Sequence, residues 1–594
     1  MGGILFKTNY HTKTDKTKFE EALNLMSHRG PDEEGLLFLN DYSFGVRRLI
    51  INDKVNGHQP LSYMQHHLIF NGEIYNDKEL SDKLKVKPEG HSDTCVLLQT
   101  LVEKGIESIK ELNGMFSFVY TKKDEVYAVV DHLGVKPLYY TILDGDLLIS
   151  SEIKSLLHIG VTPVLGLDEL HELLAMSPSH SLGKTLYKQI FELKAGHILS
   201  FNKDTGLKIE KYTDVARHKL NMCHQDMVDN LKYLLTKSVN SCLKTDRAIA
   251  GFLSGGLDSS AVIALARETL PSIDTFSIDY EGNKEEFLAN QFEKTKDEDY
   301  IGYMYKIGGI NHKTVTIDTK TLIDYLNCAV HLRDGPGMTD IDSSMLYLTK
   351  EVGKKHSVVL SGEGADELLG GYPWFNDLNF KGFPWIRNIN FRNSLINKDI
   401  INKIDLNSYL ENRYIECIKD TPVLDTDTEE IKKELRMNYI NIKYFMKTLL
   451  DRKDRMTMGA SVEARMPFGD KDLVNFLYNV PLSDKMSNNI EKGILREAMK
   501  DLLPIEILNR HKSPYPKSRS QNYHNGIKKL LRDNLKEDEP IYKILDKNCI
   551  FDLLDNDIEL ETPWYGQLMR YDALLAWIYQ TNYWLKEYKV RIDI

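Results

Sequence analysis

Residues 248–268 read AIAGFLSGGLDSSAVIALARE, which is an apolar run, a Gly/Ser turn and the first part of a helical pattern. Glycines let backbone N–H groups approach an anion, hydroxyls add donors, and the N-terminus of a helix attracts negative charge. The turn therefore predicts nucleotide phosphate binding by Ser254, Gly255, Gly256, Leu257, Asp258, Ser259 and Ser260. Asp258 beside a phosphate requires a cation between them, so the loop also predicts Mg²⁺. A capped strand–helix turn is the simpler alternative, because Asp and Ser are common N-caps.

A second polar loop, SGEGADE at residues 361–367, follows the apolar stretch SVVL at 357–360. It carries the carboxylates Glu363, Asp366 and Glu367, which are costly to bury without partners. Parallel α/β sheets collect their ligand loops at the carboxyl ends of the strands. If the two loops face one site, metal, substrate or general-base roles follow for these carboxylates. A solvated helix start is the alternative.

Two patterns of secondary structure divide the chain. Short alternating stretches such as HHLIFNGEIYN (66–76) predict antiparallel strands in the first part, and FEEALNLMSHRG (19–30) and DTCVLLQTLVEKGIESIKEL (93–112) predict helices packed on them. Later in the chain, strand–turn–helix segments predict a parallel α/β sheet. We therefore predict an α+β domain over residues 1–210 and an α/β domain over residues 225–594, with the boundary between Lys208 and Met227.

The composition limits the class of protein. The 594 residues carry a net charge of -11 and are 42% hydrophobic, as in ordinary globular proteins. The negative charge argues against nucleic-acid binding. The chain contains no run of about 18 apolar residues, so no membrane span is predicted. The six cysteines have no CxxC or zinc-type spacing, which predicts neither disulfides nor structural zinc and favours the reducing cytoplasm.

Several short motifs occur in a fixed order along the whole chain. They are HRGPD (28–32), FNGEIYN (70–76), HSD (91–93), DHLGVKPLYY (131–140), LSGGLDSS (253–260), LSGEGADELLGGY (360–372), LLDRKDRM (449–456) and EKGILRE (491–497). In this order the chain resembles the glutamine-dependent asparagine synthetases, which join a class II glutaminase to an ATP-pyrophosphatase synthetase domain. The resemblance implies an antiparallel αββα sandwich of the Ntn-hydrolase type, followed by an α/β domain with a parallel sheet.

The resemblance also implies a reaction. ATP activates the carboxylate of aspartate as an acyl-adenylate with release of pyrophosphate, and ammonia then displaces AMP to give asparagine. Asp258 and Asp366 would share Mg²⁺, Glu363 would take a proton from ammonia, Lys492 would match developing charge, and Asp454 would help to position the site. Contacts to ATP and its pyrophosphate are implied for the first loop and for Leu253, Ile278, Ser361 and Gly362.

The glutaminase half departs from the family at one position. The family uses a cysteine directly after the initiator Met, exposed when that Met is removed, as the nucleophile that attacks glutamine. This chain has Gly2 there, so we expect glutamine hydrolysis to be silent and ammonia to be the nitrogen donor. Gly2 is a natural loss, an introduced substitution or a sequence error. The resemblance implies that the other residues of the glutamine pocket are present. Arg48 would bind the carboxylate of glutamine, Glu73 and Asp93 would bind its amine, and Asn71 with Gly72 would donate to the oxyanion.

Other functions stay open at this point. A relative without the cysteine can close an amide in its own substrate, as β-lactam synthetases and lasso-peptide cyclases do, or amidate a sugar acid. An intact glutamine pocket argues against that. A non-catalytic, ligand-binding regulator on this scaffold would show decay of the phosphate loops, and SGGLDSS and SGEGADE show none. The expected partners are small molecules, with neither nucleic acid nor membrane, and relatives are commonly dimers, which makes a homodimer the expectation by analogy.

Overall fold

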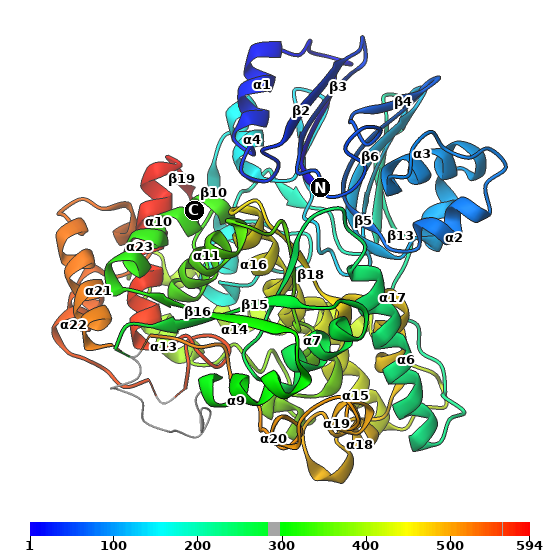
Figure 1. Cartoon of the computed structure of the whole chain (residues 1–594). Coiled ribbons are helices and arrows are strands. Elements are labelled where there is room, and N and C mark those ends of the chain that lie inside the picture. The colour runs from blue at the N-terminus through cyan, green and yellow to red at the C-terminus, as the bar shows by residue number, and fades with distance from the viewer. Residues whose placement is uncertain (283–296, 519, 561) are drawn as a thin grey trace.

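The first part of the chain forms two stacked antiparallel sheets (Figure 1). The computed structural model describes residues 1–282, 297–518, 520–560 and 562–594. One sheet has the strand order β11-β8-β9-β1-β3-β2, with β11 Phe191–Glu192, β8 Tyr139–Leu143, β9 Asp146–Ser150, β1 Gly2–Thr8, β3 Tyr42–Arg48 and β2 Glu33–Phe38. The other has the order β13-β12-β7-β6-β5-β4, with β13 Gly206–Lys211, β12 His197–Asn202, β7 Glu125–Val130, β6 Gly114–Lys122, β5 His66–Ile74 and β4 Leu61–Tyr63.

Alternation along the strands decides how these sheets pack. Phe6 and Ile69 point to the space between the sheets and belong to one apolar cluster. The strand neighbours of these residues point outward, where Leu5 packs under helix α1 (Lys16–Asn24) and Leu68 packs under helix α3 (Asp93–Lys104). The result is a helix–sheet–sheet–helix sandwich, which confirms the predicted fold of this part of the chain.

The predicted helix over residues 93–112 is shorter than the sequence suggested. Helix α3 ends at Lys104, and Gly105 follows with a φ of +77°, a conformation that ends helices. A 3-10 helix, η1 (Ile106–Glu111), continues the chain. The apolar periodicity runs through the glycine, so periodicity alone does not locate the break.

The second part of the chain contains a parallel sheet, as predicted. Its order is β16-β15-β14-β17-β18, with β16 Ile310–Ile317, β15 Ile273–Tyr280, β14 Ile249–Phe252, β17 Val358–Leu360 and β18 Glu463–Arg465. The helices that matter below are α6 His224–Cys242, α7 Leu257–Thr269, α12 Ala365–Leu369, α16 Lys447–Met458 and α19 Gly493–Ala498. Because β14 lies between β15 and β17, the loops that follow β14 and β17 open at the same edge of the sheet.

The two parts are joined by more than the connecting segment. Strand β13 ends at Lys211 and α6 begins at His224, and both positions lie within residues 208–227, where the sequence predicts the boundary. A two-stranded parallel sheet pairs β10 (Val164–Gly166) with β19 (Arg591–Asp593) near the C-terminus. Helix α16 lies below the sandwich and contacts it through buried charged residues. In the described part of the chain, no helix is long and apolar enough to cross a membrane.

Candidate active site

The two predicted loops meet in one cavity at the carboxyl ends of β14 and β17. The cavity has a volume of about 250 Å³. Among the residues that line it are twelve of the predicted ones, namely Leu253, Ser254, Gly256, Leu257, Asp258, Ser259, Ile278, Ser361, Gly362, Glu363, Asp366 and Lys492. Gly255 and Ser260 do not line it, since Gly255 packs against Tyr300 and Ser260 is fully buried in α7. The sequence prediction that both loops face one site therefore agrees with the geometry.

The loop after β14 has the shape that a phosphate needs. Gly256 caps α7, whose first residue is Leu257, so the N-terminus of this helix opens into the cavity. The two loops also touch, because a Cβ on Gly362 would lie 2.7 Å from the backbone N of Ser259. Only glycine allows that approach. The serine hydroxyls of Ser254 and Ser259 lie 3.3 Å apart beside the helix start.

A lysine bridges the two predicted metal ligands. The Lys492 Nζ lies 2.7 Å from Asp258 Oδ2 and 2.8 Å from Asp366 Oδ1, and Lys512 also contacts Asp366. Burial raises the pKa of Asp258, whereas the Lys492 and Lys512 cations outweigh burial at Asp366 and lower its pKa. The two carboxylates thus converge on one cation.

This arrangement fits a magnesium ion carried by a nucleotide. Mg²⁺ prefers carboxylate and phosphate oxygens and usually takes only one or two protein carboxylates. Asp258 and Asp366 offer such oxygens at a point that already attracts positive charge. Among the described residues, no group of three or more His, Cys, Asp or Glu side chains could hold a metal ion alone. The donor set therefore suits an ion that arrives with phosphate ligands.

Glu363 is held by two neighbouring cations. Its carboxylate lies 2.8 Å from Arg452 Nη2 and 2.9 Å from Lys453 Nζ, both on α16. Burial raises the pKa of a carboxyl group, but here Lys453 and Arg452 outweigh burial and hold the pKa of Glu363 below its usual range. In this arrangement Glu363 is a weaker proton acceptor than the role implied by the sequence resemblance requires.

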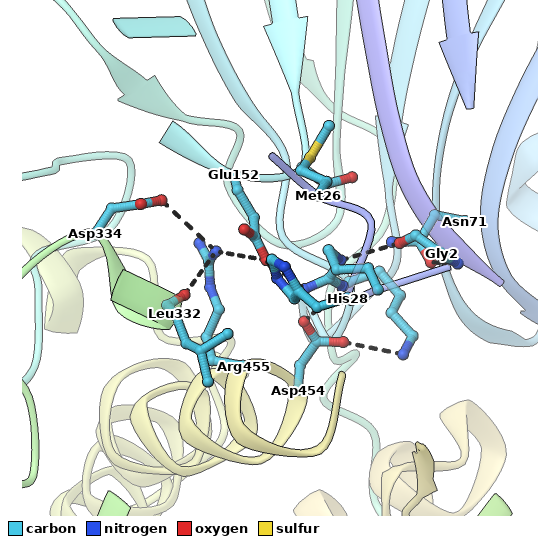
Figure 2. A network of polar contacts seen from close by, with 12 residues as sticks. Gly2, Met26, His28, Asn71, Glu152, Leu332, Asp334, Asp454 and Arg455 are labelled. Carbon is cyan, nitrogen blue, oxygen red and sulfur yellow. Dashed lines mark hydrogen bonds and ion pairs between the residues drawn. The ribbon is translucent and has the colours of Figure 1, made fainter. Parts of the chain in front are cut away.

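Asp454, which the resemblance implies helps to position the site, lies outside the cavity. Asp454 does not line the cavity; it lies on the side of α16 that faces the antiparallel sandwich (Figure 2). Its Oδ2 accepts a hydrogen bond from Arg29 Nη2 at 2.8 Å, and its Oδ1 accepts one from Lys136 Nζ at 3.0 Å. Each residue turns the helix by about 100°, so Asp454 and Arg452, two residues apart, are separated by about 200° and point to nearly opposite sides of α16. Asp454 thus belongs to the interface between the two parts of the chain.

The same interface reaches Gly2. Arg29 donates from Nε to the carbonyl oxygen of Gly2 at 3.0 Å and from Nη1 to Glu152 Oε1 at 3.2 Å. Arg455, which follows Asp454 on α16, lies 3.6 Å from the same Glu152 oxygen. The side chains of Arg29, Glu152, Asp454 and Arg455 are all 0–1% exposed. These four residues and Lys136 are called the interface charge cluster below.

The predicted glutamine pocket is formed only in part. Glu73 and Asp93 line one cavity of about 210 Å³, and burial raises the pKa of Glu73 and raises the pKa of Asp93 to about 6. Two desolvated carboxylates of this kind are stabilised by a bound ammonium group. Arg48 does not line this cavity; it pairs with Glu33 at 2.8 Å and donates to the carbonyl oxygen of Asp53. In this arrangement the Arg48 guanidinium is bound to other residues of the chain and does not face the cavity in which a ligand carboxylate is expected.

Asn71 and Gly72 lie beside Gly2. The backbone N–H of Gly2 donates to Asn71 Oδ1 at 2.9 Å, and the buried Nδ2 of Asn71 has no partner among the described residues. An unpartnered donor at this place suits the predicted oxyanion role. Gly72 has a φ of +150°, and a Cβ there would lie 2.2 Å from the carbonyl oxygen of Met115. The strand therefore admits only glycine at that position.

Gly2 is also tightly enclosed. Its φ is +152°, and a Cβ built on it would lie 1.7 Å from the carbonyl oxygen of Arg47. An ordinary C···O contact is about 3.3 Å or longer, so a side chain at Gly2 requires the backbone to move. With Met1 in place, this backbone therefore has no room for a side chain at position 2.

Comparison with known proteins agrees with this geometry. Residues 230–586 match the model of the family described as asparagine synthase, which is more than half of the chain. The chain belongs to the asparagine synthase family. Residues 1–213 match the model described as a glutamine amidotransferase domain. As a member of this family, the chain is an ATP-dependent ligase with an amidotransferase-type domain at its N-terminal end.

Two similar proteins extend over nearly the whole chain, and a third extends over part of it. One is asparagine synthetase [glutamine-hydrolyzing] 3 of Bacillus subtilis (strain 168), 37% identical over 98% of this chain and 97% of that protein. Asparagine synthetase [glutamine-hydrolyzing] 1 of the same organism is 29% identical over 95% of each. A putative asparagine synthetase [glutamine-hydrolyzing] 2 of Methanocaldococcus jannaschii is 31% identical over 60% of this chain and 73% of that protein.

Four cationic residues of this asparagine synthase family site were not predicted from the sequence. Lys453 and Lys512 contact the carboxylates of the second loop, and Arg510 pairs with Asp297 at 2.6 Å. Arg452 stands in the motif LLDRKDRM, but the sequence predicts no role for it. The three carboxylates of the second loop require cationic partners once buried, and that requirement is the signal that could have prompted a search for them.

Proposed function

We propose that this protein forms L-asparagine from L-aspartate, ATP and ammonia, through a β-aspartyl-adenylate and with release of AMP and pyrophosphate. The observation that carries the proposal is the single cavity in which the SGGLDSS loop, Glu363, Asp366 and Lys492 meet. A helix N-terminus for phosphates, a pair of carboxylates for a cation and a lysine for developing charge are the parts that adenylation of a carboxylate needs.

The side chains have distinct parts in this proposal. The loop after β14 binds the pyrophosphate of ATP, while Leu253 and Ile278 contact the adenosine. Lys492 stabilises the charge that develops on the leaving pyrophosphate. Mg²⁺, when bound between Asp258 and Asp366, would supply further stabilisation of phosphate charge. Ammonia then attacks the activated carbonyl carbon, its extra proton passes to a base for which Glu363 is the candidate, and AMP leaves.

The nitrogen source follows from Gly2. A glycine has no thiol, so it cannot form the thioester through which a class II glutaminase releases ammonia. We propose that the glutaminase half is silent in this chain and that free ammonia is used. Glu73, Asp93 and Asn71 still form the remains of a glutamine site, which supports descent from a glutamine-hydrolysing enzyme.

The test is pyrophosphate release with ATP, Mg²⁺ and aspartate, with either ammonium or glutamine as donor and with the product identified by mass. Asparagine with ammonium alone is the expected result. Glutamate formation from glutamine above a no-enzyme control would overturn the silent-glutaminase proposal. If neither ammonium nor glutamine supports turnover, aspartate is rejected as the substrate, and a cyclase-type substrate is favoured. A Gly2→Cys protein is the matched variant, with removal of Met1 checked by mass, because an N-terminal residue has no φ to constrain.

The second candidate function is that of a non-catalytic regulator. Separately, we propose a homodimer, by analogy alone. A regulator would bind ATP without consuming it, so the same pyrophosphate assay separates it from the ligase. Size-exclusion chromatography with light scattering measures the oligomeric state independently.

A further inference from the structure

The positive charges of the cavity are not evenly matched. Lys492 and Lys512 face two carboxylates, Asp258 and Asp366. At the other end, Arg452 and Lys453 share one carboxylate, that of Glu363. Within the described part of the cavity, this end therefore carries one positive charge more than its ion pairs neutralise.

Both cations are buried, which makes the imbalance significant. The side chains of Arg452 and Lys453 are each 5% exposed, and that of Glu363 is 12% exposed. The Nε of Arg452 is buried and has no hydrogen-bond partner among the described residues. A buried charged group without a full set of partners is costly, so an added anion at this end is stabilised. Asp342, a nearby carboxylate, lies 3.6 Å from Arg333 and also interacts with the charge of Arg452, but among the described residues it forms no ion pair with Arg452 or Lys453.

Aromatic and sulfur contacts hold the two cations at the wall of the cavity. The Arg452 guanidinium lies 5.2 Å from the ring centre of Tyr515, and the Lys453 ammonium lies 4.9 Å from that of Phe252. These rings line the cavity together with Met345, whose sulfur lies 3.8 Å from Lys453 Nζ. Cation–ring contacts hold the two heads in place without neutralising their charge.

The proposed reaction requires such a place. Aspartate brings two carboxylates, and only the β-carboxylate is activated, so the α-carboxylate has to be bound elsewhere without reacting. We infer that Arg452 and Lys453 bind the α-carboxylate of the acyl substrate and thereby select aspartate. This inference rests on the proposed function and names its substrate-recognition residues.

Substrate binding would also change Glu363. A second carboxylate shares the two cations, so each cation interacts less with Glu363. The interaction that lowers the pKa of Glu363 is then weaker, and the carboxylate becomes a better proton acceptor when substrate is present. Recognition and proton transfer are therefore linked at one ion-pair cluster.

The test compares aspartate with β-alanine, which is aspartate without its α-carboxylate. In Lys453→Met and Arg452→Gln, the KM for aspartate should rise about 10- to 100-fold, as expected for the loss of one charge-assisted contact. Both variants also release Glu363, which acts on either substrate, so the ratio of kcat/KM for aspartate to kcat/KM for β-alanine is the quantity compared, and this ratio should fall about 10- to 100-fold. Aspartate titrated calorimetrically with α,β-methylene-ATP present gives an independent readout, since its Kd should rise in parallel.

Controls separate the possible failures. Lys447→Met removes a buried cation at the other end of α16, where Lys447 pairs with Glu192 at 2.7 Å, and should leave the preference for aspartate unchanged. Lys453→Arg keeps the charge and should retain most of the aspartate affinity. An active wild-type enzyme whose preference survives both charge-removing substitutions would overturn the inference. A wild-type enzyme that turns over no aspartate would instead reject the proposed function itself.

Discussion

Replacing Asp454 with Asn separates an interface role from a catalytic one. In this variant Arg29 keeps Glu152 as a partner, whereas Lys136, 1% exposed, loses the only ion pair that it makes with the described residues. Leaving one buried charge unpaired costs about 3–5 kcal/mol. In a domain of about 200 residues, this corresponds to a decrease in melting temperature of roughly 6–20 °C. The kcat of the ammonia-dependent reaction, measured below the unfolding temperature, should stay within about threefold, because Asp454 does not line the cavity.

Calorimetric unfolding and pyrophosphate release are measured on the same protein preparations. The double variant Asp454→Asn with Lys136→Met is the matched control, because it removes the unpaired charge and should recover much of the lost stability. A single variant that melts like the wild type but loses kcat by about a hundredfold or more would refute this reasoning and assign Asp454 to the chemistry.

Three further predictions can be measured separately. With Met1 retained, Gly2→Ala should lower stability by about 1–3 kcal/mol in denaturant unfolding, because its Cβ meets the carbonyl oxygen of Arg47; an unchanged midpoint would contradict the close packing. Asp258→Asn should reduce pyrophosphate release by about a hundredfold or more, and unchanged release would reject the loop assignment. Burial raises the pKa of Asp214, but Lys443 outweighs burial and lowers the pKa to about 2. The resulting roughly 2 kcal/mol of stability is present above about pH 4 and lost as pH falls through about 2, so Asp214→Asn should flatten acid unfolding over that range.

The sequence predicted the cavity well because its parts are local. Each loop follows an apolar strand directly, and the strand order brings the two loops to one edge of the sheet. The contact between Gly362 and Ser259 adds detail that spacing alone does not contain. Alternation along the strands likewise predicted antiparallel sheets with helices packed on them, whereas the αββα sandwich was implied by the family resemblance.

The sequence does not predict charges that meet across long distances in the chain. The family resemblance implied that Asp454 helps to position the site, but it did not indicate the partners of Asp454, which are 425 and 318 residues earlier in the sequence. Helical periodicity gives the direction in which a side chain points, but it does not identify the residues that this side chain contacts. Arg48 was expected to bind the carboxylate of a ligand. In the structure its partner is instead an internal carboxylate, that of Glu33.

The interface charge cluster limits how such proteins can be recombined. A chimera that takes the sandwich from one relative and the synthetase part from another inherits Arg29, Lys136 and Glu152 from the first parent and Asp454 and Arg455 from the second. If the relatives differ at any of these positions, a charge is buried without its partner. The two halves are therefore expected to be exchangeable only as matched sets, and the large apolar cluster of the synthetase part, which also includes Met1, Leu49 and Met115 of the sandwich, adds to this limit.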